Sequence, residues 1–159
     1  MGCGEKSLGD SAIKKALKDA VNFESLKERN DLYYQVNESE PFSGWVKLMY
    51  DSGQAERLGR FKDGKRDGPE VAWHENGQKQ YERAFKDDKI DGPYTKCYEN
   101  GQKIMEGTYK DGIPDGPNTK WHDNGQRKAE ATYKDGAKIS AKYWNSKGEE
   151  VETEAEAEK

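Results

Sequence analysis

Residues 91–110, DGPYTKCYENGQKIMEGTYK, contain the pattern that decides the fold. An Asp-Gly-Pro triplet opens this stretch, an Asn-Gly-Gln triplet follows, and an aromatic residue with a Lys closes it. Glycines of the first motif stand at positions 44, 68, 92 and 116, and those of the second at 53, 77, 101 and 125. Phe61, Phe85, Tyr109 and Tyr133 form a third series. All three series recur at one shared interval, so the chain is built from repeats, with a degenerate fifth unit over 138–149.

Each repeat predicts two short strands. The segment between Asp-Gly-Pro and Asn-Gly is slightly shorter than the segment between Asn-Gly and the next Lys-Asp-Gly. Both lengths are typical of strands, and turn dipeptides bound both segments. The prolines of the triplets, at 69, 93 and 117, are expected at strand starts. The fold class predicted is mainly β: a single elongated antiparallel meander of hairpins with an N-terminal α-helix.

Burial selects the register of each hairpin. A loop of Asn76-Gly77 alone would put Trp73 on the face opposite Tyr81. A three-residue loop, Glu75-Asn76-Gly77, pairs His74 with Gln78 and gathers the apolar side chains on one side, so we expect this register. The predicted apolar face contains Trp45, Met49, Phe61, Val71, Trp73, Tyr81, Phe85, Cys97, Met105, Tyr109, Trp121 and Tyr133.

The flanks divide the chain into residues 1–30, a tether and helix; 31–150, the repeats; and 151–159, an acidic tail. Helical spacing of apolar residues predicts an amphipathic helix over Ser11–Leu26, with Asp10 or Ser11 as N-cap, covering the start of the sheet. Leu32–Val36 is expected to be an edge strand. The Glu-rich tail after Val151 is expected to be disordered.

Composition and charge exclude several classes of function. Hydrophobic residues make up only 31% of the chain, which disfavours a large enzyme core. Yet 4 Trp, 9 Tyr and 4 Phe are too many for a disordered chain. The six Glu and two Lys of Asn145–Lys159 carry the whole net charge of −4. The rest is neutral without a basic block, so nucleic acid is not an expected partner, and no apolar run reaches the about 20 residues of a membrane helix.

Candidate chemical residues favour structural roles. His74 and His122 occupy equivalent positions two repeats apart, about 19 Å across four strands, which is too far to share a metal. The repeated Asp residues, such as Asp63 and Asp67, are typical of Asp-Gly turns and lack calcium-loop spacing. Cys97 replaces an aromatic residue of the repeat and is expected to be buried. We therefore predict no metal, no cofactor and no catalytic residues.

The repeat unit, Asp-Gly-Pro through Asn-Gly-Gln to Tyr/Phe-Lys-Asp, resembles the MORN-variant repeat of bacteria over residues 31–150. The first unit departs from the pattern with Ser43-Gly44-Trp45, and the second has Asp88 in place of Gly. The resemblance implies a β-hairpin sheet used for protein contacts. Some members of this family are labelled antitoxins, and others are lipoproteins.

These observations predict a non-enzymatic protein-interaction scaffold, with an antitoxin-like role as its sharper form and a protein partner of unknown identity. The expected partner-binding residues are Trp45, Trp73, Tyr81, Phe85, Tyr109, Trp121 and Tyr133. The alternative is a lipid-anchored envelope protein with a spacer role, because Met1-Gly2-Cys3-Gly4 is similar to the end of a bacterial lipoprotein signal. Lipidation of Cys3 would place the chain in the bacterial envelope without direct insertion of the polypeptide, and a cytoplasmic location is expected otherwise.

Overall fold

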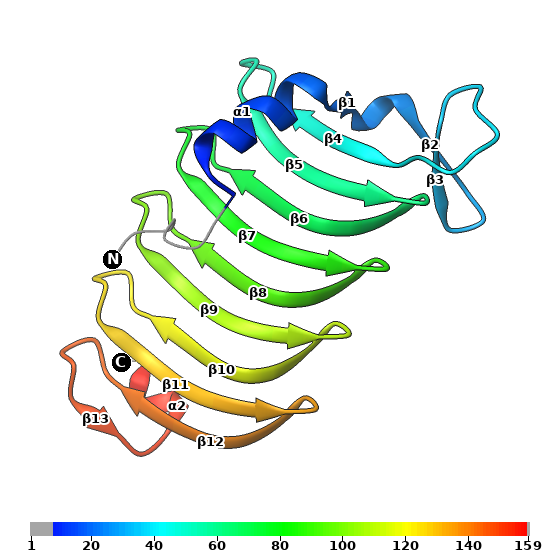
Figure 1. The fold of residues 1–159 in the computed structure, drawn as a ribbon. Coiled ribbons are helices and arrows are strands. Elements are labelled where there is room, and N and C mark those ends of the chain that lie inside the picture. Colours follow the sequence, from blue (N-terminus) through cyan, green and yellow to red (C-terminus); the bar gives the residue numbers. More distant parts are fainter. Residues whose placement is uncertain (1–7, 159) are drawn as a thin grey trace.

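A computed structural model of the protein describes residues 8–158. Within them, eleven strands form one continuous sheet, in which the strands β4 to β13 are neighbours in chain order (Figure 1). The bounds of these strands are β4 Gly44–Met49, β5 Ala55–Lys62, β6 Lys65–Trp73, β7 Lys79–Lys86, β8 Lys89–Cys97, β9 Lys103–Lys110, β10 Ile113–Trp121, β11 Arg127–Lys134, β12 Ala137–Trp144 and β13 Glu150–Val151. The predicted elongated antiparallel meander is confirmed.

Two kinds of turn alternate along the sheet. In the loop that joins β6 to β7, the His74 backbone N–H donates to the Gln78 carbonyl at 2.8 Å, and the Gly77 N–H donates to the His74 carbonyl at 2.9 Å. The predicted three-residue loop is therefore correct, with Gly77 at φ +83°. In the turn that joins β5 to β6, Lys62 pairs with Lys65 around Asp63-Gly64. The φ values of +49° and +81° at these two residues suit a two-residue turn that follows the twist of the strands. The degenerate fifth unit forms the same three-residue loop, since the Asn145 N–H donates to the Glu149 carbonyl.

A β-bulge after each three-residue loop changes the predicted faces. Trp73 pairs with Lys79 while Ala72 pairs with Tyr81, so Gln80 is an extra residue on β7. The same shift recurs at Glu56, Ile104 and Lys128. Because one extra residue turns all later side chains to the other side, the single apolar face expected from the sequence is wrong.

The bulge sorts the aromatic residues by type onto two faces. The register places Trp45, Trp73, Trp121 and Trp144 on one side, together with Leu58, Val71 and Cys97; we call this the tryptophan face. The opposite side carries Phe61, Tyr81, Phe85, Tyr94, Met105, Tyr109 and Tyr133; we call this the tyrosine face.

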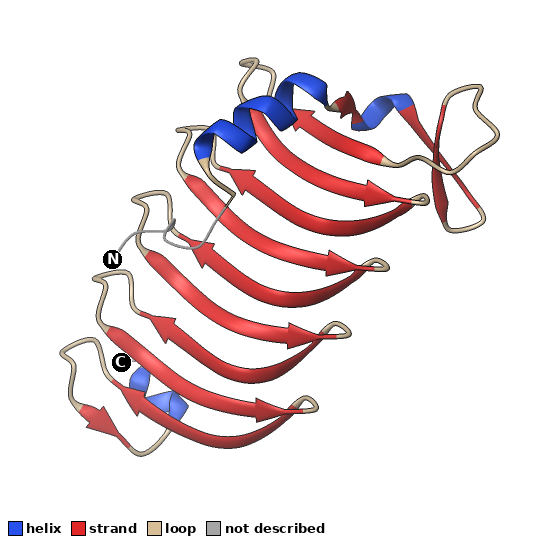
Figure 2. Cartoon of the chain, in the orientation of Figure 1, coloured by secondary structure: helices blue, strands red, loops and turns tan. Residues whose placement is uncertain are grey.

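The Asp-Gly-Pro triplets lie inside strands β6, β8 and β10, which corrects their expected position at strand starts. In β6, Asp67, Gly68 and Pro69 lie between the pairs Phe61↔Arg66 and Gly59↔Glu70, so they form a second bulge. Gly68, Gly92 and Gly116 adopt φ values of +120°, +114° and +120° there, a conformation that favours glycine. Figure 2 shows that the long strands are bent along their length, as bulges of this kind produce.

The N-terminal helix α1, Asp10–Asp19, covers the first strands of the tryptophan face (Figure 1). Ile13, Ala16 and Ala20 pack with Leu58, and Trp45 and Trp73 lie against this cluster. The predicted cover is thus confirmed, but the helix ends at Asp19 instead of Leu26 and is preceded by Gly9 without a side-chain cap. The helix is shorter than expected because the next residues form β1, Val21–Asn22, which pairs in parallel with β4.

Leu32–Val36 is not the edge of the main sheet. Strand β3, Leu32–Gln35, pairs with β2, Leu26–Arg29, in a separate hairpin that follows the 3-10 turn η1, Phe23–Ser25. The Tyr33 ring meets the Phe61 ring edge-on at 5.5 Å, and Leu26, Val46 and Phe61 form a buried cluster beside it. Aromatic contacts therefore hold this hairpin over the tyrosine face of the first strands, and the short β1 takes the edge.

The acidic tail is ordered, in contrast to the expectation. It forms a one-turn helix α2, Glu154–Ala157, in which Thr153 and Glu156 make a capping box. Ala157 is 0% exposed, and Glu154 contacts Lys120 and Lys138 on the tyrosine face. Glu158 forms an ion pair with Lys128 at 2.6 Å. Basic residues of the last repeats therefore hold this segment against the sheet, although its composition alone predicts a solvated tail.

Candidate functional site

Charged residues on the tryptophan face form ion pairs within strands β7, β9 and β11. Lys79 pairs with Glu82 at 3.3 Å, Lys103 with Glu106 at 2.5 Å, and Arg127 with Glu130 at 2.9 Å. These three pairs are one interaction that recurs in successive repeats, made possible by the bulge that brings residues i and i+3 to the same side. The glutamates at one repeat position thus pair with the cations of β7, β9 and β11 on this face.

The predicted partner-binding residues do not form one surface. Trp45 and Trp73 lie under α1, and Trp121 lies farther along the same face, with the Lys103 ammonium 5.5 Å from its ring. Tyr81, Phe85, Tyr109 and Tyr133 are on the tyrosine face instead. The binding strip expected from the sequence is therefore split between a partly covered side and the side opposite.

A chain of tyrosine rings runs across the middle of the tyrosine face. Tyr81 and Tyr94 meet edge to face with centroids 6.4 Å apart, and Tyr94 and Tyr109 are 5.7 Å apart. Tyr94 belongs to this row of rings, although it is not among the residues that the sequence predicted to bind a partner. Half-buried rings in such a row offer flat apolar contact area with a polar hydroxyl at the end.

Arg83 anchors one end of the tyrosine row. Its guanidinium donates to Glu70 Oε1 at 2.9 and 2.7 Å, and it lies over the rings of Tyr81 and Phe85 at 4.5 and 4.8 Å. Glu70 is 4% exposed and Phe85 is 6% exposed. Phe85 is therefore a supporting core residue under the arginines rather than a binding anchor.

Tyr81 and Tyr109 remain protonated at neutral pH because their pKa values are raised. Burial raises the pKa of Tyr81, and the nearby Glu70 carboxylate raises it further. Burial is also the main cause of the raised pKa of Tyr109, followed by the neighbouring Tyr94. Their hydroxyls can therefore donate hydrogen bonds to an acceptor placed on the strip.

Cations on the middle of the tyrosine face lack the in-strand partners that those on the tryptophan face have. The paired positions of β7–β11 on this side include Lys96 and Lys120 and carry no carboxylate, whereas Arg83 is paired with Glu70 of the neighbouring strand β6. Lys96 is exposed and forms no ion pair with any residue of 8–158. Lys120 finds its carboxylate in α2, with Nζ 3.2 Å from Glu154 Oε1. Lys96 and Lys120 occupy the same position in successive repeats, a signal that was present in the sequence and was missed.

Acid should release α2 from this face. The Lys120 hydrogen bond and charge, followed by Lys138, hold the pKa of Glu154 below its ordinary value. A depressed pKa means that docking is fully stabilised above about pH 4.3, the unfolded value, and is lost as pH falls through the lower folded value. Amide NMR shifts of α2 should therefore change with a midpoint below about 4.3. A midpoint at or above that value would contradict the ion pair.

Rim residues of the sheet serve the repeat itself. The ring Nε2 of His74 lies 3.2 Å from the Cys97 carbonyl oxygen, and that of His122 lies 2.9 Å from the Trp144 carbonyl oxygen. Tyr50, at the equivalent position, donates to the Trp73 carbonyl at 2.8 Å. Each side chain thus contacts the backbone of the next repeat.

The repeated aspartates and Cys97 occupy structural positions. Asp91 and Asp115 accept hydrogen bonds from the turn amides of Asp111 and Asp135, so these aspartates link neighbouring turns. No group of three or more His, Cys, Asp or Glu side chains in residues 8–158 is arranged to hold a metal. Cys97 is buried at 1% exposed, and Cys3 lies outside the described residues. In the same part of the chain, no helix is both long and apolar enough to span a bilayer.

Comparison with known families identifies the repeat. The model of the MORN repeat variant matches residues 66–87, 90–111 and 114–135, which correspond to β6 to β11 with their turns. A search of curated proteins found no match. Repeats of this family are generally non-enzymatic and occur commonly in scaffolds that contact proteins or membranes. Three consecutive units of the chain therefore match the MORN repeat variant, and the hairpins before and after them extend the same sheet.

Proposed function

We propose that this chain is a protein-interaction scaffold, and that its partner presents an acidic segment to the middle of the tyrosine face. One observation carries the proposal: on this face the exposed Lys96 forms no ion pair with any residue of 8–158 and Lys120 meets a carboxylate of the acidic helix α2, while cations of β7, β9 and β11 on the opposite face pair with glutamates of their own strands. Complementary charge of this kind selects partners and guides their approach.

The chain's own acidic helix supports the kind of partner proposed. Helix α2 meets the tyrosine face through Glu154 on Lys120 and Lys138, while its Ala157 is fully buried. A partner with alternating Glu and small residues could make the same contacts one repeat farther along. Its Glu residues would pair with Lys96, and its small residues would pack against the tyrosine rings. Glu and Ala alternate in the same way in residues 154–158 of the chain itself.

A peptide titration tests this function. We expect a synthetic peptide with the sequence of residues 151–158 to bind the full chain, more tightly when Glu154→Gln and Glu158→Gln free the basic residues beneath α2. Reversal of charge at Lys96 and Lys120, as Lys96→Glu with Lys120→Glu, should weaken binding by roughly tenfold or more, since each removed charge pair contributes about 1 kcal/mol. Affinity should also fall with added salt.

The control reverses an exposed charge on the other face. Lys142→Glu lies on the tryptophan side and should leave peptide binding unchanged. Equal loss from Lys142→Glu and from the Lys96/Lys120 pair would contradict a site on the tyrosine face. Absence of peptide binding, together with salt-sensitive sedimentation of the chain with anionic vesicles, would replace the protein partner by a membrane surface.

Two finer roles come from the sequence resemblance alone. An antitoxin would be one case of a scaffold that engages a single protein, and a lipid-anchored envelope protein would use Cys3. Both stay predictions.

A further inference from the structure

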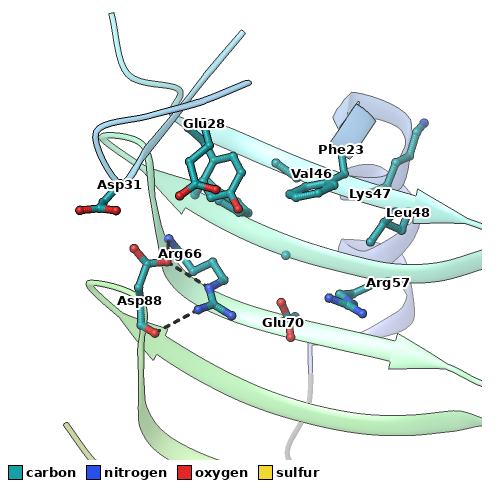
Figure 3. A pocket seen from close by; sticks show the side chains of 13 residues that line it. Phe23, Glu28, Asp31, Val46, Lys47, Leu48, Arg57, Arg66, Glu70 and Asp88 are labelled. Carbon is teal, nitrogen blue, oxygen red and sulfur yellow. Dashed lines mark hydrogen bonds and ion pairs between the residues drawn. The ribbon is translucent and has the colours of Figure 1, made fainter. Parts of the chain in front are cut away.

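A cavity of about 400 Å³ lies beside the tyrosine strip, between the β2–β3 hairpin and strands β4 to β6 (Figure 3). Phe23 and Tyr33 line it from the hairpin side, and Val46 and Phe61 line it from the sheet. This volume is within the range of small-molecule sites, which combine apolar walls with a few polar groups. It is separate from the peptide contacts proposed above, which involve Lys96 and Lys120.

Gly59 leaves the sheet wall of this cavity open. Its backbone does not require glycine, because its φ is not in the left-handed region, and the three atoms nearest to a Cβ placed there belong to Glu70, at 3.5 to 3.9 Å. Gly107, two repeats along, shows the contrast, because the Asn118 side chain fills the space above it. The position equivalent to Gly59 in the next repeat is Arg83. The missing side chain at Gly59 thus creates volume, and it serves no turn.

Most of the charged groups around the cavity already have partners. Arg66 donates to Asp88 through its backbone N–H and Nε, both at 3.0 Å. Glu70 accepts both hydrogen bonds from Arg83. Glu28 interacts with the Tyr33 hydroxyl, and its charge contributes to the raised pKa of Tyr33, after burial as the main cause. These pairs build the wall and leave little capacity for a ligand.

Arg57 is the cation of this wall with an unsatisfied donor. Its Nε is buried and makes no hydrogen bond to any residue of 8–158, although the side chain as a whole is 40% exposed. The guanidinium forms an ion pair with Glu56 at the long distance of 3.8 Å. A buried N–H without an acceptor costs free energy that a ligand oxygen would recover.

We propose that this cavity binds a small monocarboxylate with an aromatic body. The carboxylate accepts hydrogen bonds from Arg57, and the ring lies over Gly59 against Phe23, Val46 and Phe61. Glu28 and Asp31 line the hairpin end of the cavity and disfavour a second negative charge there. The selectivity for one carboxylate follows from the unused donor capacity of Arg57 at one end and these acidic residues at the other.

The test uses 3-phenylpropionate and its neutral amide, 3-phenylpropionamide, titrated into the full chain by calorimetry or amide NMR. We expect the acid to bind roughly tenfold more tightly than the amide, because a charged hydrogen bond to arginine is the stronger kind. Arg57→Gln should remove this preference while leaving weak binding of both probes. Arg127→Gln, on the tryptophan face, is the matched control and should change neither affinity.

Gly59→Leu fills the cavity and should abolish binding of both probes. Circular dichroism and peptide binding at Lys96 report whether this variant keeps its fold, and Arg57→Gln tests the site independently if it does not. Equal binding of acid and amide to the wild-type chain, no binding of either at millimolar concentration, or unchanged binding to Gly59→Leu would each overturn the proposal.

Discussion

Replacing Leu58 with Ala is expected to lower the free energy of unfolding by about 3 kcal/mol. Leu58 is 1% exposed and lies between the sheet and helix α1, in contact with the cluster of Ile13, Ala16 and Ala20. Truncation removes apolar contacts from both layers and leaves a cavity that a sheet and a helix cannot close. Urea unfolding followed by tryptophan fluorescence measures the loss, since Trp45 and Trp73 border the same cluster.

Ile139→Ala is the matched control for this variant. Ile139 is 65% exposed, so its truncation should change stability by less than about 0.5 kcal/mol. If Leu58→Ala were as mild as Ile139→Ala, helix α1 would not be packed on the tryptophan face in solution.

Gly68→Ala should cost about 3 kcal/mol, through two effects that act together. Gly68 adopts φ +120°, which side-chain-bearing residues avoid, and a Cβ there would lie 2.9 Å from Arg60 Cβ. The bulge that bends β6 depends on this residue, so the substitution strains the strand and its neighbour. Thermal and urea unfolding give the magnitude.

Gly53→Ala separates the two effects. Gly53 also has a positive φ, of +83°, but a Cβ there would meet no atom within 4 Å. Its loss should be about 1 kcal/mol, from backbone conformation alone. Equal losses at Gly53 and Gly68 would show that the Asp-Gly-Pro bulge is not the crowded bend seen in β6.

The repeat and its turns were predictable because their residues are chemically distinctive. Asn76-Gly77 demands a turn, and the pairing of His74 with Gln78 followed from the need to bury apolar side chains. The bulge that follows each of these loops has no distinctive residue that would have predicted it. Its residues, Glu56, Gln80, Ile104 and Lys128, share no property, and a register without it places the tryptophans and tyrosines on one side.

The predicted strand ends were wrong because Asp-Gly dipeptides occur in two different local structures. Each repeat contains Asp-Gly or a related pair twice, once in a tight turn such as Asp63-Gly64 and once in a bulge such as Asp67-Gly68. Both need glycine at positive φ, so residue type cannot tell them apart; only the pairing of Lys62 with Lys65 does.

The site was harder to predict than the fold because it depends on which charges remain unpaired. The Glu content of the tail indicates a solvated segment, although Thr153 and Glu156 already have capping-box spacing. The excess of cations on the tyrosine face appears only after the register assigns Lys103 to Glu106 and leaves Lys96 alone. The cavity at Gly59 depends on the contact of Tyr33 with Phe61, which joins segments far apart in the sequence.

Residue-by-residue NMR mapping of the acidic peptide on the full chain tests the central claim most directly. We expect the largest shift changes at Tyr81, Tyr94, Lys96, Tyr109 and Lys120, and little change at Trp121, Lys103 and Lys142. Changes centred on the tryptophan face, or spread equally over both faces, would contradict the assignment of the tyrosine face as the binding surface.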